Sequence, residues 1–220
     1  MKFIPNILTL ANAAFGCFAL FYVANLDFEM TTLCILLAAA FDFFDGFIAR
    51  AKGWTTRFGL ELDSLADLIS FGVVPGALAT LMLKTINIDF PLMFLGFVIT
   101  LSSAFRLAKY NIIEEHEINF RGLPTPANAL IWVGVPHLGI DLNFPLILSG
   151  IIITSYLLNS PIIFYRFQIK NSLSSLIIVL ITIMTFFFLW ARFSFGAFTF
   201  VVIIYIASSI IYHFVEKSKE

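Results

Sequence analysis

Long apolar stretches constrain this chain more than any other feature. A helix needs about 20 residues to cross the roughly 30 Å hydrocarbon core of a bilayer. Because only 12% of the 220 residues are charged and 60% are apolar, the chain lacks the charge that a soluble domain of this size needs on its surface. We therefore predict an all-α polytopic membrane protein with about eight transmembrane helices. The eight stretches are Asn6–Ala24, Met30–Arg50, Glu61–Met82, Phe90–Tyr110, Pro126–Gly139, Phe144–Tyr165, Ser172–Trp190 and Phe195–Phe214.

The number of spans can be tested against the distribution of basic residues. The fifth stretch is short and contains Pro136, so it can be broken or tilted, and six or seven spans remain open. If all eight stretches cross from a cytoplasmic N-terminus, every Lys and Arg except Lys84 and Arg192 falls on the cytoplasmic side. Cytoplasmic loops of membrane proteins are enriched in Lys and Arg. We therefore favour eight spans with both termini in the cytoplasm, in a single membrane-embedded domain covering residues 1–220.

Four aspartates stand out because they lie inside or beside apolar stretches. Asp42 and Asp45 are three residues apart near the end of the second stretch, and Asp63 and Asp67 are four apart near the start of the third. Residues with these spacings share one face of a helix. The second and third stretches are consecutive and therefore antiparallel, so we expect the four carboxylates to converge in one pocket open to the cytoplasm.

Carboxylates within a membrane are costly and normally mark a functional site. A static ion network with Arg50 and Arg57 is the plainer alternative, but the four acids outnumber these partners. Two divalent cations would balance four negative charges, and ligands that are all oxygen suit Mg²⁺, Mn²⁺ or Ca²⁺. A pair of such ions can stabilise both the attacking and the leaving oxygen in phosphoryl chemistry.

The residues between the acids favour a ligand that carries phosphate. Gly46 follows Asp45 directly and Gly59 comes four residues before Asp63, and glycine lets a bulky ligand approach the backbone. Ala49 is small enough to keep the same face open, and Arg50 offers a planar fork of donors to phosphate oxygens. With a net charge of only −1, the chain gives no indication of nucleic-acid binding.

The complete pattern is Asp42-x2-Asp45-Gly46-x2-Ala49-Arg50-x8-Gly59-x3-Asp63-x3-Asp67. It resembles, without a gap, the signature of the CDP-alcohol phosphotransferase family. The resemblance implies a helical membrane fold, usually a homodimer, with two divalent metal ions on the four aspartates. It also implies that a cytidine diphosphate headgroup lies over Gly46, Ala49 and Arg50. Asp67 is then both a metal ligand and the general base.

The flanking segments resemble one branch of this family. They are Pro5–Asn12, Asp63–Pro75, Phe105–Asn111 and Phe120–Ala127. They are similar to the members that transfer the phosphatidyl group of CDP-diacylglycerol to the hydroxyl of L-serine and release CMP. Because the resemblance covers about the first 130 residues, we expect the catalytic core in residues 1–130 and additional transmembrane helices in residues 131–220.

This reading suggests further binding residues. Asn6 and Thr9 share a helical face and are expected in the nucleotide pocket. Arg106, Asn111 and Arg121 lie at the expected cytoplasmic ends of the fourth and fifth stretches and are candidates for binding serine. Arg106 or Arg121 could hold the serine carboxylate through two parallel hydrogen bonds. Ordinary anchoring of basic residues at the cytoplasmic interface is the competing explanation.

Two other functions remain open at this stage. The acceptor could be glycerol 3-phosphate, inositol phosphate or another alcohol, although a phosphorylated acceptor calls for a denser basic pocket than the sequence offers. An ion-coupled transporter is a more distant alternative, but its carboxylates would lie near the middle of the bilayer. We expect an integral protein of a bacterial inner membrane, with its active site facing the cytoplasm.

Overall fold

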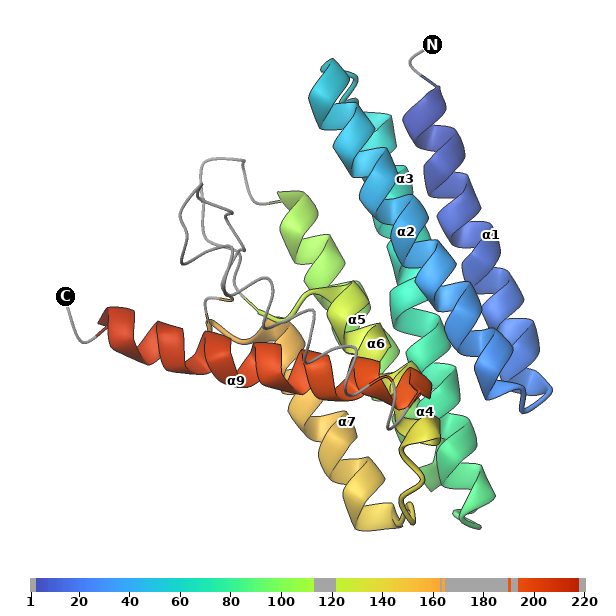
Figure 1. Cartoon of the computed structure of the whole chain (residues 1–220). Coiled ribbons are helices and arrows are strands. Elements are labelled where there is room, and N and C mark those ends of the chain that lie inside the picture. Colours follow the sequence, from blue (N-terminus) through green and yellow to red (C-terminus); the bar gives the residue numbers. More distant parts are fainter. Residues whose placement is uncertain (1–2, 113–121, 163, 165–189, 191–193, 218–220) are drawn as a thin grey trace.

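The computed structural model describes residues 3–112, 122–162, 164, 190 and 194–217. This part of the chain consists of helices joined by short connections and contains no strand (Figure 1). The elements are α1 (Ile4–Ala24), α2 (Phe28–Lys52), α3 (Arg57–Asp67), the π-helix η1 (Leu68–Val73), α4 (Val74–Thr85), the 3₁₀ turn η2 (Leu92–Gly96), α5 (Phe97–Ile112), α6 (Thr125–Gly134), η3 (Val135–Leu138), α7 (Phe144–Asn159), η4 (Ser194–Gly196) and α9 (Ala197–Lys217).

Five helical units are long and apolar enough to cross a membrane. They are Ile4–Ala24, Phe28–Lys52, Arg57–Thr85, Leu92–Ile112 and Ser194–Ile211. They correspond to five of the eight predicted stretches and support a polytopic membrane protein. The third unit runs through α3, η1 and α4 without a break, so it is longer than the predicted Glu61–Met82. The seventh predicted stretch lies outside the described residues except for Trp190, and the total of eight spans stays a prediction.

The fifth and sixth stretches form shorter helices than the others. α6 has only 10 residues and continues into the 3₁₀ turn η3, which contains Pro136, as the short fifth stretch suggested. α7 ends at Asn159, although the predicted stretch continues to Tyr165. Ser160, which follows α7, is extended (φ −69°, ψ 153°) and precedes Pro161. A residue before proline is pushed out of the helical region by the proline ring, which explains this early end.

The unit Arg57–Thr85 is the central helix of the bundle. Within its apolar 18-residue stretch, 61% is buried, compared with 22–28% for the corresponding stretches of the other four units. α1 and α2 pack together and against η1, while α5 and α6 also contact η1. The main core includes Ile35 from α2, Phe71 from η1 and Leu78 from α4, all of them fully enclosed. Helices α1, α2, α5 and α6 therefore surround η1.

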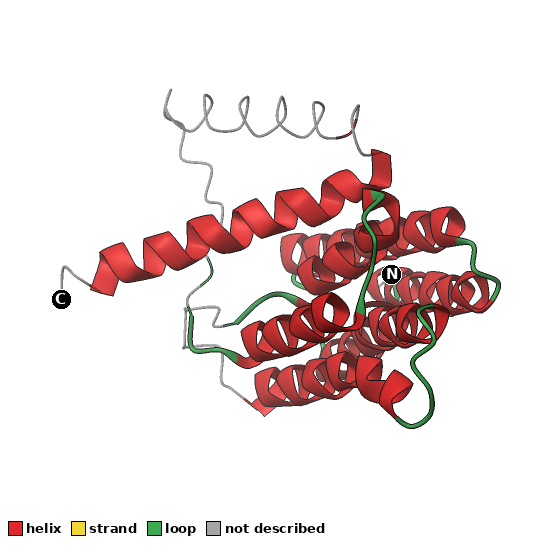
Figure 2. Ribbon diagram, turned by 90° about the horizontal axis from the view of Figure 1, so that it is seen from below, coloured by secondary structure: helices red, strands yellow, loops and turns green. Residues whose placement is uncertain are grey.

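α9 is oriented differently from the rest of the bundle. Figure 2 shows most other helices nearly end-on, whereas α9 is seen from the side and crosses them. It packs against α6, where Thr199 Oγ1 donates to the carbonyl oxygen of Ile131 at 2.9 Å. Gly134 makes this approach possible, because a Cβ there would lie only 3.0 Å from the Thr199 nitrogen.

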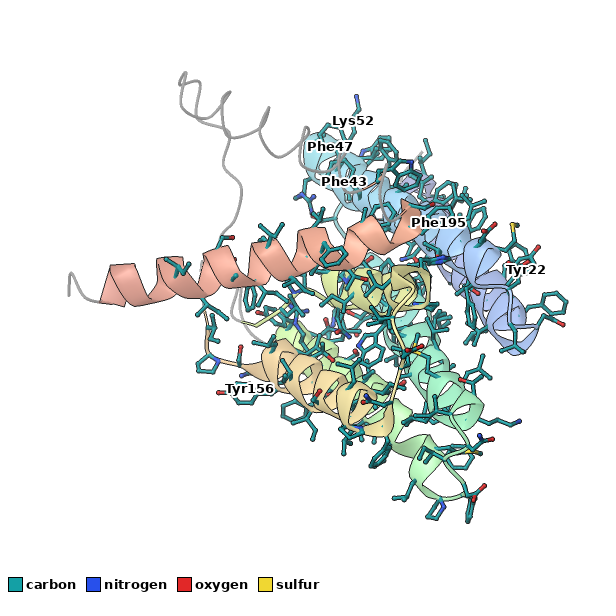
Figure 3. The ribbon with its side chains drawn as sticks, turned by 60° about the horizontal axis from the view of Figure 1, so that its bottom comes forward. Tyr22, Phe43, Phe47, Lys52, Tyr156 and Phe195 are labelled. Carbon is teal, nitrogen blue, oxygen red and sulfur yellow. The ribbon has the colours of Figure 1, made fainter. Side chains whose placement is uncertain are left out.

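Large apolar side chains cover the outside of the described part. Phe43 and Phe47 on α2 and Tyr156 on α7 point away from the bundle (Figure 3) and are 62%, 56% and 64% exposed. Water would disfavour such a surface, but lipid tails solvate it, which agrees with the apolar helices.

Candidate active site

The four predicted aspartates come from two neighbouring helices. Asp42 and Asp45 lie in the second half of α2, and Asp63 and Asp67 lie on α3, with Asp67 as its last residue. Asp42, Asp63 and Asp67 each place one carboxylate oxygen within 4.8 Å of the others. Asp45 is also close enough to interact electrostatically with Asp42 and Asp63. The structure thus brings together the carboxylates whose convergence the spacings predicted.

The turn between α2 and α3 makes this convergence possible. Gly53 follows α2 with a left-handed backbone (φ 63°), a conformation that glycine adopts without a steric penalty. Thr56 then caps α3, because its Oγ1 accepts from the Gly59 N–H at 3.0 Å. The chain reverses direction within a few residues, so α3 runs back along α2 and its aspartates face those of α2.

Two polar residues of α1 hold carboxylates of the cluster. Thr9 Oγ1 donates to Asp45 Oδ2 at 2.5 Å, and both residues are buried. Asn12 Nδ2 donates to Asp67 Oδ1 at 3.2 Å. The sequence analysis did not predict this contact between Asn12 and Asp67. Its only sequence signal was a polar side chain three residues after Thr9 in an apolar helix.

The π-helix η1 begins directly after Asp67. Short π-helical segments are rare and often occur at functional sites. Ser70 Oγ in η1 donates to the carbonyl oxygen of Asn12 at 3.0 Å, and Thr100 Oγ1 donates to the carbonyl oxygen of Gly72 at 2.9 Å. These bonds tie η1 to α1 and α5, so the backbone that carries Asp67 is fixed on both sides.

The donor set of the cluster fits a divalent metal ion. Three carboxylate oxygens from separate side chains lie within coordinating reach of a common centre. Asp63 Oδ1 is buried and has no hydrogen-bond partner in the described part of the chain. Hard cations such as Mg²⁺ prefer oxygen ligands of this kind. The cluster can therefore hold at least one divalent ion, and such an ion would offset the mutual repulsion of the carboxylates.

A pocket of about 220 Å³ adjoins the cluster. All six residues predicted to bind the CDP-lipid line it: Asn6, Thr9, Gly46, Ala49, Arg50 and Gly59. Asp45 and Asp63 also line the pocket, so it is continuous with the carboxylates. Trp54, Thr55 and Thr56 complete one wall. The sequence reading did not include these three, although they fill the gap between Arg50 and Gly59 in the signature.

The two glycines of the signature have different neighbours. A Cβ at Gly46 would lie 3.0 Å from Arg50 Nη1, so the missing side chain lets the guanidinium fold back along α2. A Cβ at Gly59 would lie 3.2 Å from Asn6 Oδ1, which allows α1 and α3 to approach closely. The glycines thus shape the pocket and place one cation and one amide in its wall.

The three residues predicted to bind serine differ in their surroundings. Arg106 is only 5% exposed and interacts electrostatically with Asp67. Asn111 is exposed, and its amide bonds α3: it accepts from Ser64 Oγ at 2.9 Å and donates to Glu61 Oε2 at 3.0 Å. Arg121 lies outside the described residues. The structure thus brings Arg106 near the aspartate cluster, whereas Asn111 links α5 to α3 through its hydrogen bonds.

Fold and site together define a polytopic helical membrane protein with an acidic centre beside a pocket lined by polar side chains. A family model described as CDP-alcohol phosphatidyltransferase matches residues 2–170. The chain therefore belongs to the CDP-alcohol phosphatidyltransferase family.

Individual relatives carry more specific names. The chain is 32% identical over 186 residues to a CDP-diacylglycerol–serine O-phosphatidyltransferase of Helicobacter pylori, covering 80% of this chain and 78% of the relative. It is 32% identical over 173 residues to the enzyme of the same name from Bacillus subtilis, covering 76% and 93%. An archaetidylserine synthase of Methanothermobacter thermautotrophicus is 36% identical over 134 residues, which cover 58% of this chain and 54% of the relative.

Proposed function

We propose that this protein is a phosphatidylserine synthase, which transfers the phosphatidyl group of CDP-diacylglycerol to the hydroxyl of L-serine and releases CMP. The observation that carries the proposal is the pocket lined by all six residues predicted to bind the CDP-lipid, directly beside the aspartate cluster. Relatives named for serine transfer match most of the chain and support serine as the acceptor.

The nucleotide part of the substrate would occupy the pocket. Arg50 would contact the diphosphate, because its guanidinium borders the pocket beside Gly46. Asn6 and the hydroxyl of Thr56 offer hydrogen-bond partners to the cytidine and ribose. Trp54 provides an aromatic face of the kind on which a base can stack. The diacylglycerol chains would extend into the lipid that surrounds the bundle.

The aspartates would hold two divalent ions, which supply neutralising charge for the diphosphate and for the leaving CMP when bound. The serine hydroxyl oxygen attacks the phosphorus that bears the diacylglycerol, and the bond from that phosphorus to the oxygen of CMP breaks. Asp67 accepts the proton of the serine hydroxyl. Asn12 keeps the Asp67 carboxylate in place through its hydrogen bond, and Thr9 does the same for Asp45.

Orientation and assembly are further parts of the proposal. The pocket is lined partly by the turn between α2 and α3, a segment that carries Lys52 and Arg57. By the positive-inside rule this end faces the cytoplasm, where serine and CMP are soluble. Bacterial relatives favour an inner-membrane location. Family resemblance further leads us to propose a homodimer.

A panel of acceptors tests the proposed reaction. Purified protein in detergent micelles containing CDP-diacylglycerol and Mg²⁺ or Mn²⁺ is given L-serine, glycerol 3-phosphate or inositol 1-phosphate. We expect CMP release and phosphatidylserine, detected by mass spectrometry, with serine only, and complete loss of both when EDTA removes the metal. CMP release that depends on a phosphorylated acceptor instead of serine would contradict the proposal. Absence of CMP release with every acceptor would also contradict it.

A further inference from the structure

Arg106 on α5 is a buried cation with unused hydrogen-bond donors. The residue is 5% exposed, and its Nε and Nη2 atoms have no hydrogen-bond partner within the described part of the chain. Burying the donors of an ionised group without acceptors is costly, even though Tyr110 and Asp67 interact with other parts of this guanidinium or with its charge. A ligand that supplies the missing acceptors would explain why a guanidinium is buried at this position of α5.

The two unused donors form a matched pair. Nε–H and one N–H of Nη2 lie on the same edge of the planar guanidinium and point in the same direction. This edge fits the two oxygens of a carboxylate through parallel hydrogen bonds. The ring of Tyr110 lies over one face of the guanidinium, 4.5 Å from its central carbon, which restricts the orientation of the fork.

Arg106 belongs to a different part of the site from the nucleotide pocket. Residues of α1, α2, α3 and the turn between α2 and α3 line the pocket, and neither Arg106 nor Asp67 is among them. Arg106 comes from α5 and interacts electrostatically with Asp67. A phosphoryl transfer needs its attacking and leaving oxygens roughly in line on either side of phosphorus. An acceptor bound at Arg106 would reach Asp67 from the side of α5, whereas the leaving nucleotide would occupy the pocket that α1, α2 and α3 line. The attacking and leaving oxygens would then come from different sides of the phosphorus.

The charge at this position indicates which class of acceptor fits. The next cation along α5, Lys109, is exposed, so only one guanidinium is buried on this helix. The guanidinium fork fits the oxygens of a carboxylate or a phosphate, but its single positive charge balances only the one negative charge of a carboxylate. We infer that Arg106 binds the carboxylate of the acceptor and thereby selects an amino acid with a side-chain hydroxyl over phosphorylated alcohols. This inference rests on the proposed function and assigns its acceptor specificity to one residue.

The test compares L-serine with serinol, which keeps the amino group and a reactive hydroxyl but has a hydroxymethyl group in place of the carboxylate. For the wild type, we expect kcat/KM to be about 100-fold higher with serine than with serinol, since hydrogen bonds to charged groups are strong. In Arg106→Met, kcat/KM for serine should fall close to the serinol value, while the values for serinol and the KM for CDP-diacylglycerol change little. Arg106→Lys keeps the charge but loses the fork, so its preference should be intermediate.

Lys109→Met removes an exposed cation from the same helix and should keep the wild-type preference for serine. If Arg106→Met does not fold, Arg106→Lys still carries the test. Equal use of serine and serinol by the wild type, or a wild-type preference in both Arg106 variants, would overturn the inference and leave the proposed reaction intact. A wild type that forms no phosphatidylserine would instead refute the proposed function.

Discussion

At the scale of single residues, the site depends on polar groups of α1 that donate hydrogen bonds to the carboxylates, in addition to the residues that line the pocket. Thr9 has both roles, because it lines the pocket and also donates to Asp45 at 2.5 Å. Asp45 is only 4% exposed, so water cannot easily replace this donor. Residues that orient metal ligands typically change metal affinity 10- to 100-fold when they are altered.

We therefore predict a change in metal dependence for Thr9→Val, which keeps the shape of the side chain and removes the hydroxyl. The concentration of Mg²⁺ that gives half-maximal CMP release should rise about tenfold, at the low end of this range. Thr9→Ser, which retains a hydroxyl, serves as the matched control and should stay near the wild-type value. An unchanged Mg²⁺ titration in Thr9→Val would show that the bond does not support the metal site.

At the scale of helices, small residues let polar backbone and side chains of different elements meet. Gly16 on α1 lies against η1, where a Cβ would come 3.0 Å from Ser70 Cα and 3.1 Å from Ile69 Cγ2. This contact allows Ser70 to reach the backbone of Asn12, whose side chain bonds Asp67. Close helix contacts through glycine are common in membranes, where van der Waals packing replaces the hydrophobic driving force.

Gly16→Ala should separate α1 from η1, because the new methyl group would overlap with Ser70 Oγ and crowd Ser70 Cα. Inserting a group into a packed core typically costs about 1–3 kcal/mol. We expect a lower thermal unfolding temperature in detergent and a lower kcat, since Asn12 and Asp67 shift together. Ala14→Val adds bulk at an exposed position of the same helix and should change neither quantity. Wild-type stability and turnover in Gly16→Ala would argue against this contact.

At the scale of the whole molecule, the pocket lies toward one end of the bundle. The turn between α2 and α3 borders the pocket. The connection between η3 and α7 lies at the opposite end of the bundle (Figure 1). The predicted orientation places the first end in the cytoplasm, and the distribution of Lys and Arg is the reason. Orientation also decides from which side serine can reach the site.

Single cysteines can test this orientation. In a background with Cys17→Ser and Cys34→Ala, we place a cysteine at Ala51 or at Asp141, which are both exposed. A thiol reagent that cannot cross membranes should label the Asp141→Cys variant in spheroplasts and the Ala51→Cys variant only after the membrane is opened or inverted. CMP release by each variant confirms that it is folded. The reverse labelling pattern would place the pocket on the outer side.

The sequence by itself determined the class of fold and most of the site. Apolar length and the spacing of Asp42, Asp45, Asp63 and Asp67 are local properties, because a bilayer selects for helix length and a helix sets which residues share a face. The same holds for Gly46, Ala49, Arg50 and Gly59, which belong to the signature and line the pocket. These features needed no knowledge of how distant segments pack.

Only the tertiary structure decided which polar groups support or extend this site. Asn12 meets Asp67 across 55 positions of sequence, and Asn111 bonds α3 instead of remaining available to a ligand. Arg106 is buried with an unused fork, whereas Lys109, three residues later, is exposed. Such partners are set by the packing of α1 and α5 around α3 and η1. Periodicity gives the direction of a side chain on its own helix but not the neighbour that it meets.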